Sequence, residues 1–242
     1  MNIHLNKILI TGGATGIGLG LSTRFVSENN QVIVCGRRTD ALNDLKDKHP
    51  AVVTRQCDLS VEQERIGLYG WICAEHPDLG VLVNNAGIQQ HMSLADDDFY
   101  TRAKEEMSVN IDAPLHLAVL FAGLPALKTI INVTSGLAFV PMVKAPVYCA
   151  TKAFFHSFTL TLREMVRGRG IEVIELIPPA LNTDLGGKGL HDYAPPVSDF
   201  IETVFAGLRE GKPEISFGFS EAMTKAGPDE LRQTFVRMNQ AR

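Results

Sequence analysis

Residues 7–18 read KILITGGATGIG, an apolar run that ends in a glycine-rich turn and leads into a segment with helical spacing of apolar residues. Glycines in such a turn allow a sharp bend, a close approach to a pyrophosphate, and tight packing of the helix on the strand, while the helix N-terminus offers free N–H groups to an anion. A plain tight turn is the alternative, but the position between strand and helix favours a nucleotide site. We expect dinucleotide contacts from Gly12, Thr15, Gly16, Ile17 and Gly18.

The remaining chain alternates short apolar runs with longer segments of helical periodicity. Strands are predicted at Lys7 to Ile10, Gln31 to Cys35, Val52 to Cys57, Val81 to Asn84, Thr129 to Thr134, Ile171 to Ile177 and Pro213 to Phe217. Helices are predicted at Gly18 to Glu28, Asp40 to Lys48, Val61 to Glu75, Val109 to Leu124 and Ser198 to Leu208, with a partly helical tail after Phe219. This alternation predicts an α/β fold: a Rossmann-like, doubly wound parallel sheet of about seven strands with helices on both faces. We expect one domain over residues 1–242, with a variable substrate loop and helix at 185–210.

Composition narrows the function classes. The chain is 45% hydrophobic and 21% charged, with a formal net charge of -4, which disfavours disorder and gives no attraction to nucleic acid or to an anionic membrane. The four cysteines are scattered, so neither a metal site nor a disulfide framework is expected. The N-terminus lacks the features of an export signal, and a cytoplasmic location is expected. The expected partner is a small molecule.

The end of the second predicted strand indicates which dinucleotide binds. An NAD enzyme normally carries an acid there for the ribose hydroxyls, whereas a 2′-phosphate requires positive charge. This strand ends in Gly36-Arg37-Arg38, and no carboxylate follows until Asp40. Two solvated arginines in a surface turn are the alternative. We expect Arg37 and Arg38 to bind the extra phosphate, which favours NADP over NAD.

Three residues form a candidate reacting set. Tyr148 and Lys152 are four residues apart on a helix-like run, so their side chains share one face. A free tyrosine has a pKa of about 10, and a neighbouring cation such as Lys152 favours the phenolate. Ser135 follows a predicted strand, so it shares the carboxyl edge of the sheet with the glycine turn. A cap or turn is the alternative role for Ser135, but it does not explain why three suitable residues converge.

The sequence resembles the short-chain dehydrogenase/reductase family in its single-domain branch. The matching motifs are the TGxxxGIG turn at Thr11 to Gly18, Asp58-Leu59, the NNAG sequence that includes Asn85, Ala86 and Gly87, Asn110 in SVNIDAP, Ser135, and the YxxxK pair Tyr148 and Lys152. They occur in family order over about residues 7 to 183. The phrases VTSGLAF, PVYCATKA and LIPPALNTDL further resemble a bacterial branch labelled DltE-like oxidoreductases.

The resemblance implies a role for each matching residue. Tyr148 would exchange a proton with the substrate, Lys152 would lower the pKa of Tyr148 and bind the nicotinamide ribose, and Ser135 would polarise a carbonyl. Asn110 would hold a water that links Lys152 to solvent. Its alternative role is to fix a kink in the helix, and the two roles are compatible. Cofactor contacts are also implied for Asp58, Leu59, Asn85, Ala86, Gly87, Tyr148, Lys152, Pro178 and Thr183. The usual Pro-Gly is Pro178-Pro179 here, so the backbone is stiffer and pocket shape is harder to predict.

Substrate selectivity is expected from loop residues around this set. The candidates are Leu181, Leu185, His191 and Tyr193 on one side and Phe139, Met142, Gln89 and Gln90 on the other, with His191 more consistent with a surface loop position than with catalysis. The helix after Lys152 is apolar on more than one face, which predicts a homodimer or homotetramer; packing within one subunit is the alternative.

The leading interpretation is an NADP-dependent oxidoreductase that transfers a hydride between the nicotinamide and a small carbonyl or alcohol substrate. A dinucleotide-binding sensor or regulator on the same fold is the alternative from another class, which the intact Ser135, Tyr148, Lys152 and Asn110 disfavour. A sugar-nucleotide epimerase or dehydratase would need a larger C-terminal region than 242 residues leave.

Overall fold

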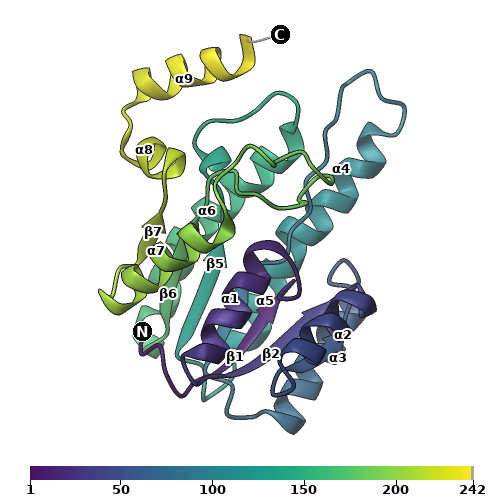
Figure 1. The fold of residues 1–242 in the computed structure, drawn as a ribbon, viewed down its shortest axis with the longest axis vertical. Coiled ribbons are helices and arrows are strands. Elements are labelled where there is room, and N and C mark those ends of the chain that lie inside the picture. Colours follow the sequence, from purple (N-terminus) through teal and green to yellow (C-terminus); the bar gives the residue numbers. More distant parts are fainter. Residues whose placement is uncertain (241–242) are drawn as a thin grey trace.

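The computed structural model describes residues 1–240 and contains a seven-stranded sheet with the order β3-β2-β1-β4-β5-β6-β7, in which all neighbouring strands are parallel. The strands are β1 (Lys7–Thr11), β2 (Gln31–Gly36), β3 (Val53–Gln56), β4 (Val81–Asn84), β5 (Thr129–Val133), β6 (Glu172–Ile177) and β7 (Glu214–Ser216). Helices cover both faces of the sheet (Figure 1). The predicted Rossmann-like, doubly wound α/β fold is confirmed.

Each face of the sheet carries its own apolar core. On one face, Ile8 and Ile10 of β1 pack with α1 (Gly16–Ser27), α2 (Thr39–Lys48) and α7 (Val197–Arg209). On the other face, Leu9 packs with α3 (Glu62–Glu75), α5 (Ala113–Ala122) and α6 (Pro146–Val166). Successive side chains of a strand point to opposite faces, so a strand buried on both sides must be apolar throughout. This requirement explains the continuous apolar runs of the sequence.

The strand order reverses between β1 and β4. From β1 the chain proceeds outward to β2 and β3, and it then returns to the other side of β1 to build β4, β5, β6 and β7. In open α/β sheets such a reversal leaves a crevice at the carboxyl ends of the strands, where ligands bind. The segments that follow β1, β4, β5 and β6 carry most of the predicted site residues, and they meet at this edge.

The sequence prediction missed one helix. Residues Phe99–Met107 form α4, which continues through a π-helical turn at Ser108–Asp112 into α5, whereas the predicted helix began at Val109. The buried positions of this segment are Ala103, Glu106, Val109 and Asn110. Because two of these four residues are polar, the apolar periodicity that identifies a helix is weak. Asn110 lies within the π-helical turn itself.

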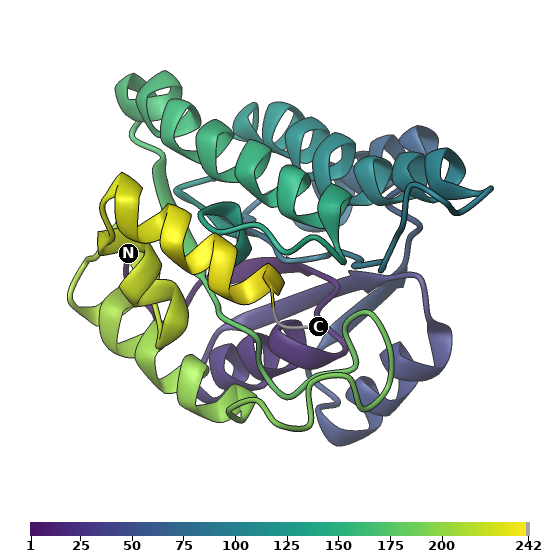
Figure 2. The same cartoon turned by 90° about the horizontal axis from the view of Figure 1, so that it is seen from above.

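The last part of the chain packs over the carboxyl edge. After β7, α8 (Phe219–Lys225) and α9 (Pro228–Gln240) form the helical tail expected from the sequence. Asn239 of α9 accepts a hydrogen bond from Val143 N at 2.7 Å and donates one to the Pro141 carbonyl at 3.1 Å. These contacts hold α9 against the segment that leads into α6, and Figure 2 shows α9 above this edge. Within residues 1–240, no helix has the combined length and apolar character needed to cross a bilayer.

Candidate active site

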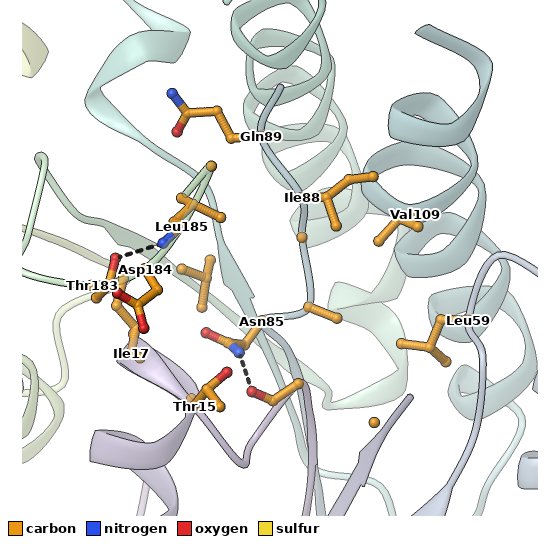
Figure 3. A pocket seen from close by; sticks show the side chains of 18 of the residues that line it. Thr15, Ile17, Leu59, Asn85, Ile88, Gln89, Val109, Thr183, Asp184 and Leu185 are labelled. Carbon is orange, nitrogen blue, oxygen red and sulfur yellow. Dashed lines mark hydrogen bonds between the residues drawn. The ribbon is translucent and has the colours of Figure 1, made fainter. Parts of the chain in front are cut away.

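A cavity of about 750 Å³ lies at the carboxyl edge of the sheet. Thr183 and Leu185 approach it from one side and Leu59 and Val109 from the other (Figure 3). All sixteen residues predicted to bind the cofactor line this cavity: Gly12, Thr15, Gly16, Ile17, Gly18, Arg37, Arg38, Asp58, Leu59, Asn85, Ala86, Gly87, Tyr148, Lys152, Pro178 and Thr183. Residues that are up to 171 positions apart in sequence, such as Gly12 and Thr183, are therefore brought to one place.

The glycine turn forms the floor of one end of the cavity. Gly16 has a φ of +52°, which favours glycine, and a Cβ at Gly18 would lie 2.2 Å from the Gly12 carbonyl oxygen. Asn85 donates hydrogen bonds from Nδ2 to the carbonyls of Thr11 at 2.9 Å and of Gly12 at 3.2 Å. The turn is thus held in a shape that only small residues permit, with the N-terminus of α1 facing the cavity. This geometry fits a pyrophosphate.

Two guanidinium groups stand at the outer end of the cavity. Arg38 donates from Nη2 to the Thr15 hydroxyl at 2.9 Å, and Arg37 lies 4.0 Å from a carboxylate oxygen of Asp58. The Arg37 side chain is 63% exposed, and its ion pair with Asp58 is long. Both cations therefore remain accessible to a ligand. The chemistry of this end of the cavity suits a phosphate group on the ribose.

The reacting set lies at the opposite end of the cavity. Pro146 begins α6, where its missing N–H costs no helical hydrogen bond, and Tyr148 and Lys152 follow on one face. Both side chains are buried, and Lys152 Nζ lies 5.6 Å from the centroid of the Tyr148 ring. Lys152 Nζ donates to the Val133 carbonyl at 2.9 Å. Helix α6 is thereby fixed to the end of β5, which carries Ser135.

Burial sets the protonation of both groups. It raises the pKa of Tyr148 well above the usual range, and a hydrogen bond with Ser135 partly opposes that effect. It lowers the pKa of Lys152 to about 8, against the opposing influence of the Glu106 carboxyl group. The protein by itself therefore holds Tyr148 as a neutral phenol.

Ser135 combines two roles that the sequence left as alternatives. It is buried at the start of a short 3₁₀ turn (Gly136–Ala138), and its Oγ accepts a hydrogen bond from Leu137 N at 3.1 Å. The serine is therefore a cap. The Ser135 hydroxyl also favours a lower pKa of Tyr148, which associates it with the reacting set.

Asn110 fixes the irregular backbone around it. Its Oδ1 accepts from Ile88 N at 2.9 Å, and its Nδ2 donates to the Ile88 carbonyl at 2.8 Å and to the Thr151 hydroxyl at 3.1 Å. A Cβ at Gly87 would lie 3.3 Å from Asn110 Oδ1 and 3.7 Å from Lys152 Nζ, so both side chains meet at Gly87. Asn110 thus stabilises the π-helical turn. Its role in holding a water stays a prediction.

The residues expected on the substrate side divide into two groups. Gln89 and Leu185 line the cavity, and Met142 and Leu185 pack around Tyr148. Leu181 instead belongs to the apolar core and Tyr193 is 80% exposed, so neither lies at the cavity. Leu181 is buried because it packs in the same apolar core as residues of α1 and α7.

Several residues of the site escaped sequence reasoning. Asn182, Asp184, Gly186 and Gly187 line the cavity from the loop after β6, whose Gly-rich and Pro-rich composition predicts a loop but no particular contacts. Glu106 was also not predicted, and its carboxyl group acts electrostatically on Tyr148 and Lys152. Its spacing of four residues from Asn110 on one helix was the available signal.

Comparison with known proteins shows the family of this chain. A family model described as short chain dehydrogenase matches residues 6–193. The chain belongs to the short-chain dehydrogenase/reductase family of oxidoreductases.

Individual relatives extend the comparison. The chain is 40% identical over 255 aligned positions to the uncharacterized oxidoreductase DltE of Bacillus subtilis (strain 168), covering 99% of this chain and 98% of that protein. It is 31% identical to the NADP-dependent 3-hydroxy acid dehydrogenase YdfG of Salmonella typhi, over 71% of each chain. A short chain dehydrogenase from Burkholderia cenocepacia J2315, solved in complex with NADP, shares the fold with a TM-score of 0.84 at 24% identity, covering 98% of this chain and 99% of that one. The expected resemblance to DltE-like oxidoreductases is confirmed.

Proposed function

We propose that this protein is an NADP-dependent oxidoreductase that transfers a hydride between the nicotinamide and a small carbonyl or alcohol substrate, with Tyr148 as the acid and base. The observation that carries the proposal is that one cavity joins the glycine turn, the Arg37 and Arg38 pair, and Tyr148 with Lys152. The NADP-bound structure of the relative from Burkholderia cenocepacia and the NADP dependence of YdfG support the choice of dinucleotide.

The residues present fit the dinucleotide along its length. The glycine turn and the N-terminus of α1 would hold the pyrophosphate, and Arg37 and Arg38 would hold the 2′-phosphate. Lys152 would hold the nicotinamide ribose. When bound, the reduced dinucleotide would supply the hydride and its oxidised form would accept one.

The protein residues supply the proton and the orientation. In the reducing direction, Ser135 donates a hydrogen bond to the substrate oxygen, and Tyr148 transfers its phenolic proton to that oxygen as the carbonyl carbon is reduced. The resulting phenolate is stabilised by the ammonium of Lys152 and is reprotonated from solvent. In the oxidising direction, Tyr148 accepts the alcohol proton. Because the raised pKa of Tyr148 favours the phenol, the proton that the reducing direction requires is present in the free protein.

The surroundings of Tyr148 indicate the substrate class. Met142 and Leu185 provide apolar contacts, and Gln89 adds a hydrogen-bonding group. A compact substrate with an apolar part and few polar groups is therefore favoured.

Three sequence-based predictions concern the whole molecule and belong to this proposal. We propose that residues 1–242 form one NAD(P)-binding domain with a substrate loop and helix at 185–210. We also propose a homodimer or homotetramer and a cytoplasmic location.

The test is to incubate the protein with NADPH and a panel of small aldehydes, ketones and keto acids, and to measure NADPH consumption by absorbance. Turnover of at least one compound by the wild-type chain, and its loss in Tyr148→Phe, is the expected result. If NADPH binds but no compound in the panel is reduced, the sensor interpretation replaces the enzymatic one.

A further inference from the structure

Glu106 is a fully buried acid that the proposed chemistry leaves without a role. Its side chain in α4 is 0% exposed. Its Oε1 accepts a hydrogen bond from Gln90 N at 2.9 Å, and its Oε2 has no hydrogen-bond partner among residues 1–240. A glutamate is almost never fully buried unless it is paired. A half-satisfied carboxyl group in the interior therefore requires an explanation.

The position of Glu106 places it beside the reacting set. It lies one helical turn before Asn110 on the same face of the helix, and Asn110 bonds to Thr151 of α6. Helices α4 and α6 pack side by side, as Figure 2 shows. The inner face of α4 therefore meets the part of α6 that carries Tyr148 and Lys152.

Four titratable groups interact electrostatically with the Glu106 carboxyl group: Tyr148, Cys149 and Lys152 on α6, and Arg102 on its own helix. Of the two cations, Arg102 favours ionisation of Glu106 more strongly than Lys152 does. Arg102 is already engaged: its guanidinium donates to the Gln90 side chain at 2.9 Å and to the His91 carbonyl at 2.6 Å. Lys152 is the cation whose only hydrogen bond among the described residues is to a neutral carbonyl, that of Val133.

Burial brings the pKa values of Glu106 and Lys152 close together. It raises the pKa of Glu106 to about 7, although the Gln90 amide and the charges of Arg102 and Lys152 favour ionisation. It lowers the pKa of Lys152 to about 8, although the Glu106 carboxylate favours the ammonium. Near neutrality each group thus stabilises the charged form of the other.

We propose that Glu106 is a positioning residue of the reacting set: its buried carboxylate is the counter-charge of the Lys152 ammonium and keeps Lys152 protonated beside Tyr148. The charge coupling follows from the packing of α4 on α6, and its effect on turnover rests on the proposed function. A neutral Lys152 can no longer stabilise the Tyr148 phenolate, so loss of the counter-charge restricts activity to lower pH.

The coupling can be measured without any substrate. The carboxyl carbon of Glu106 is followed by NMR in protein labelled with ¹³C at glutamate Cδ, and the signal is assigned by its loss in Glu106→Gln. We expect the titration midpoint to rise by up to about one pH unit in Lys152→Met, because one of the two cations that favour the carboxylate is gone. The measurement is made in free and NADPH-loaded protein. An unchanged midpoint in a folded Lys152→Met variant overturns the proposal.

Turnover supplies the second readout. Glu106→Gln keeps an acceptor for the Gln90 amide but cannot ionise, so we expect near wild-type activity at about pH 6 and a loss of about tenfold at about pH 8. Glu105→Gln is the matched control, because Glu105 is the neighbouring exposed residue, and its profile should follow that of the wild type. Glu106→Asp retains a carboxylate and should restore part of the activity at high pH.

A loss that is equal at every pH, or a profile identical to that of the wild type, refutes the role of Glu106. If the wild-type chain reduces no carbonyl compound, the proposed function fails while the NMR titration still decides whether Glu106 and Lys152 are coupled.

Discussion

Replacing Arg37 and Arg38 together with alanine tests the choice of dinucleotide. Both guanidiniums stand at the cavity and are exposed, Arg37 by 63% of its side chain. A hydrogen bond to a charged group contributes about 1.5 to 3 kcal/mol, and solvent exposure reduces this to about 1 to 1.5 kcal/mol for each arginine. The double variant should therefore lose about 2 to 3 kcal/mol of NADPH binding, which is a rise of about 30- to 150-fold in Kd.

The assay is a fluorescence titration of NADPH and NADH with each variant. NADH lacks the 2′-phosphate, so its Kd should change by less than about threefold. The control is Arg167→Ala with Arg169→Ala, which removes the same charge from exposed positions at the other end of α6. Equal losses for the two dinucleotides, or an equal loss of NADPH binding in the control, would refute the reasoning.

Three further predictions concern the reacting set, the glycine turn and a buried ion pair. Tyr148→Phe should lower kcat by about 10² to 10⁴-fold while the Kd of NADPH stays near that of the wild type, since the proton donor is lost but little of the cavity changes; retained turnover would exclude Tyr148 as the acid. Gly18→Ala should lower Tm, because its Cβ would lie 2.2 Å from a backbone carbonyl oxygen, and each kcal/mol of overpacking corresponds to about 2 to 4 °C. Gly67→Ala in α3 should raise Tm slightly, because a Cβ there would meet no atom within 4 Å apart from its chain neighbours and the nearby backbone of its own helix. Similar shifts of Tm for the two variants in calorimetry would contradict this prediction. The pKa of His156 is raised mainly by its hydrogen bond with Glu175 at 2.9 Å. This pair therefore stabilises the fold fully below the pKa that His156 has in the unfolded chain, and the stabilisation is lost as pH rises through its pKa in the folded protein. In denaturant unfolding, Glu175→Gln should lower the free energy of unfolding more at about pH 5.5 than at about pH 9.

The elements of the sheet were the most predictable part of the fold. Strands that are buried on both faces read as continuous apolar runs, and β4 and β5 were found to within a residue at each end. At the edge of the sheet, β3 is only partly buried, and its observed bounds, Val53–Gln56, are narrower than predicted. Helix α4 was missed because one of its two buried positions holds the charged residue Glu106 where an apolar residue is normally expected.

The site residues likewise divide into those that the sequence predicts and those that it does not. Residues set by local geometry, such as the glycine turn and the Tyr148 and Lys152 pair, follow from spacing alone. Contacts that depend on how two helices pack do not: the spacing of Glu106 from Asn110 is a signal within one helix, but the sequence does not show that α4 packs on α6. The same limit applies to Leu181, which reads as a loop residue but is buried in the core by the path of the chain after β6.

The π-helical turn at Ser108–Asp112 has a consequence for how this helix can change over evolutionary time. A π turn is equivalent to one extra residue in an α-helix, and each residue rotates the helix by about 100°. Deleting Ser108 would therefore turn α4 relative to α5 and carry Glu106 away from α6, while the later residues of α5 kept their place on the sheet. A single-codon insertion or deletion can thus exchange the set of side chains that α4 presents to the active site without disturbing the core beneath it.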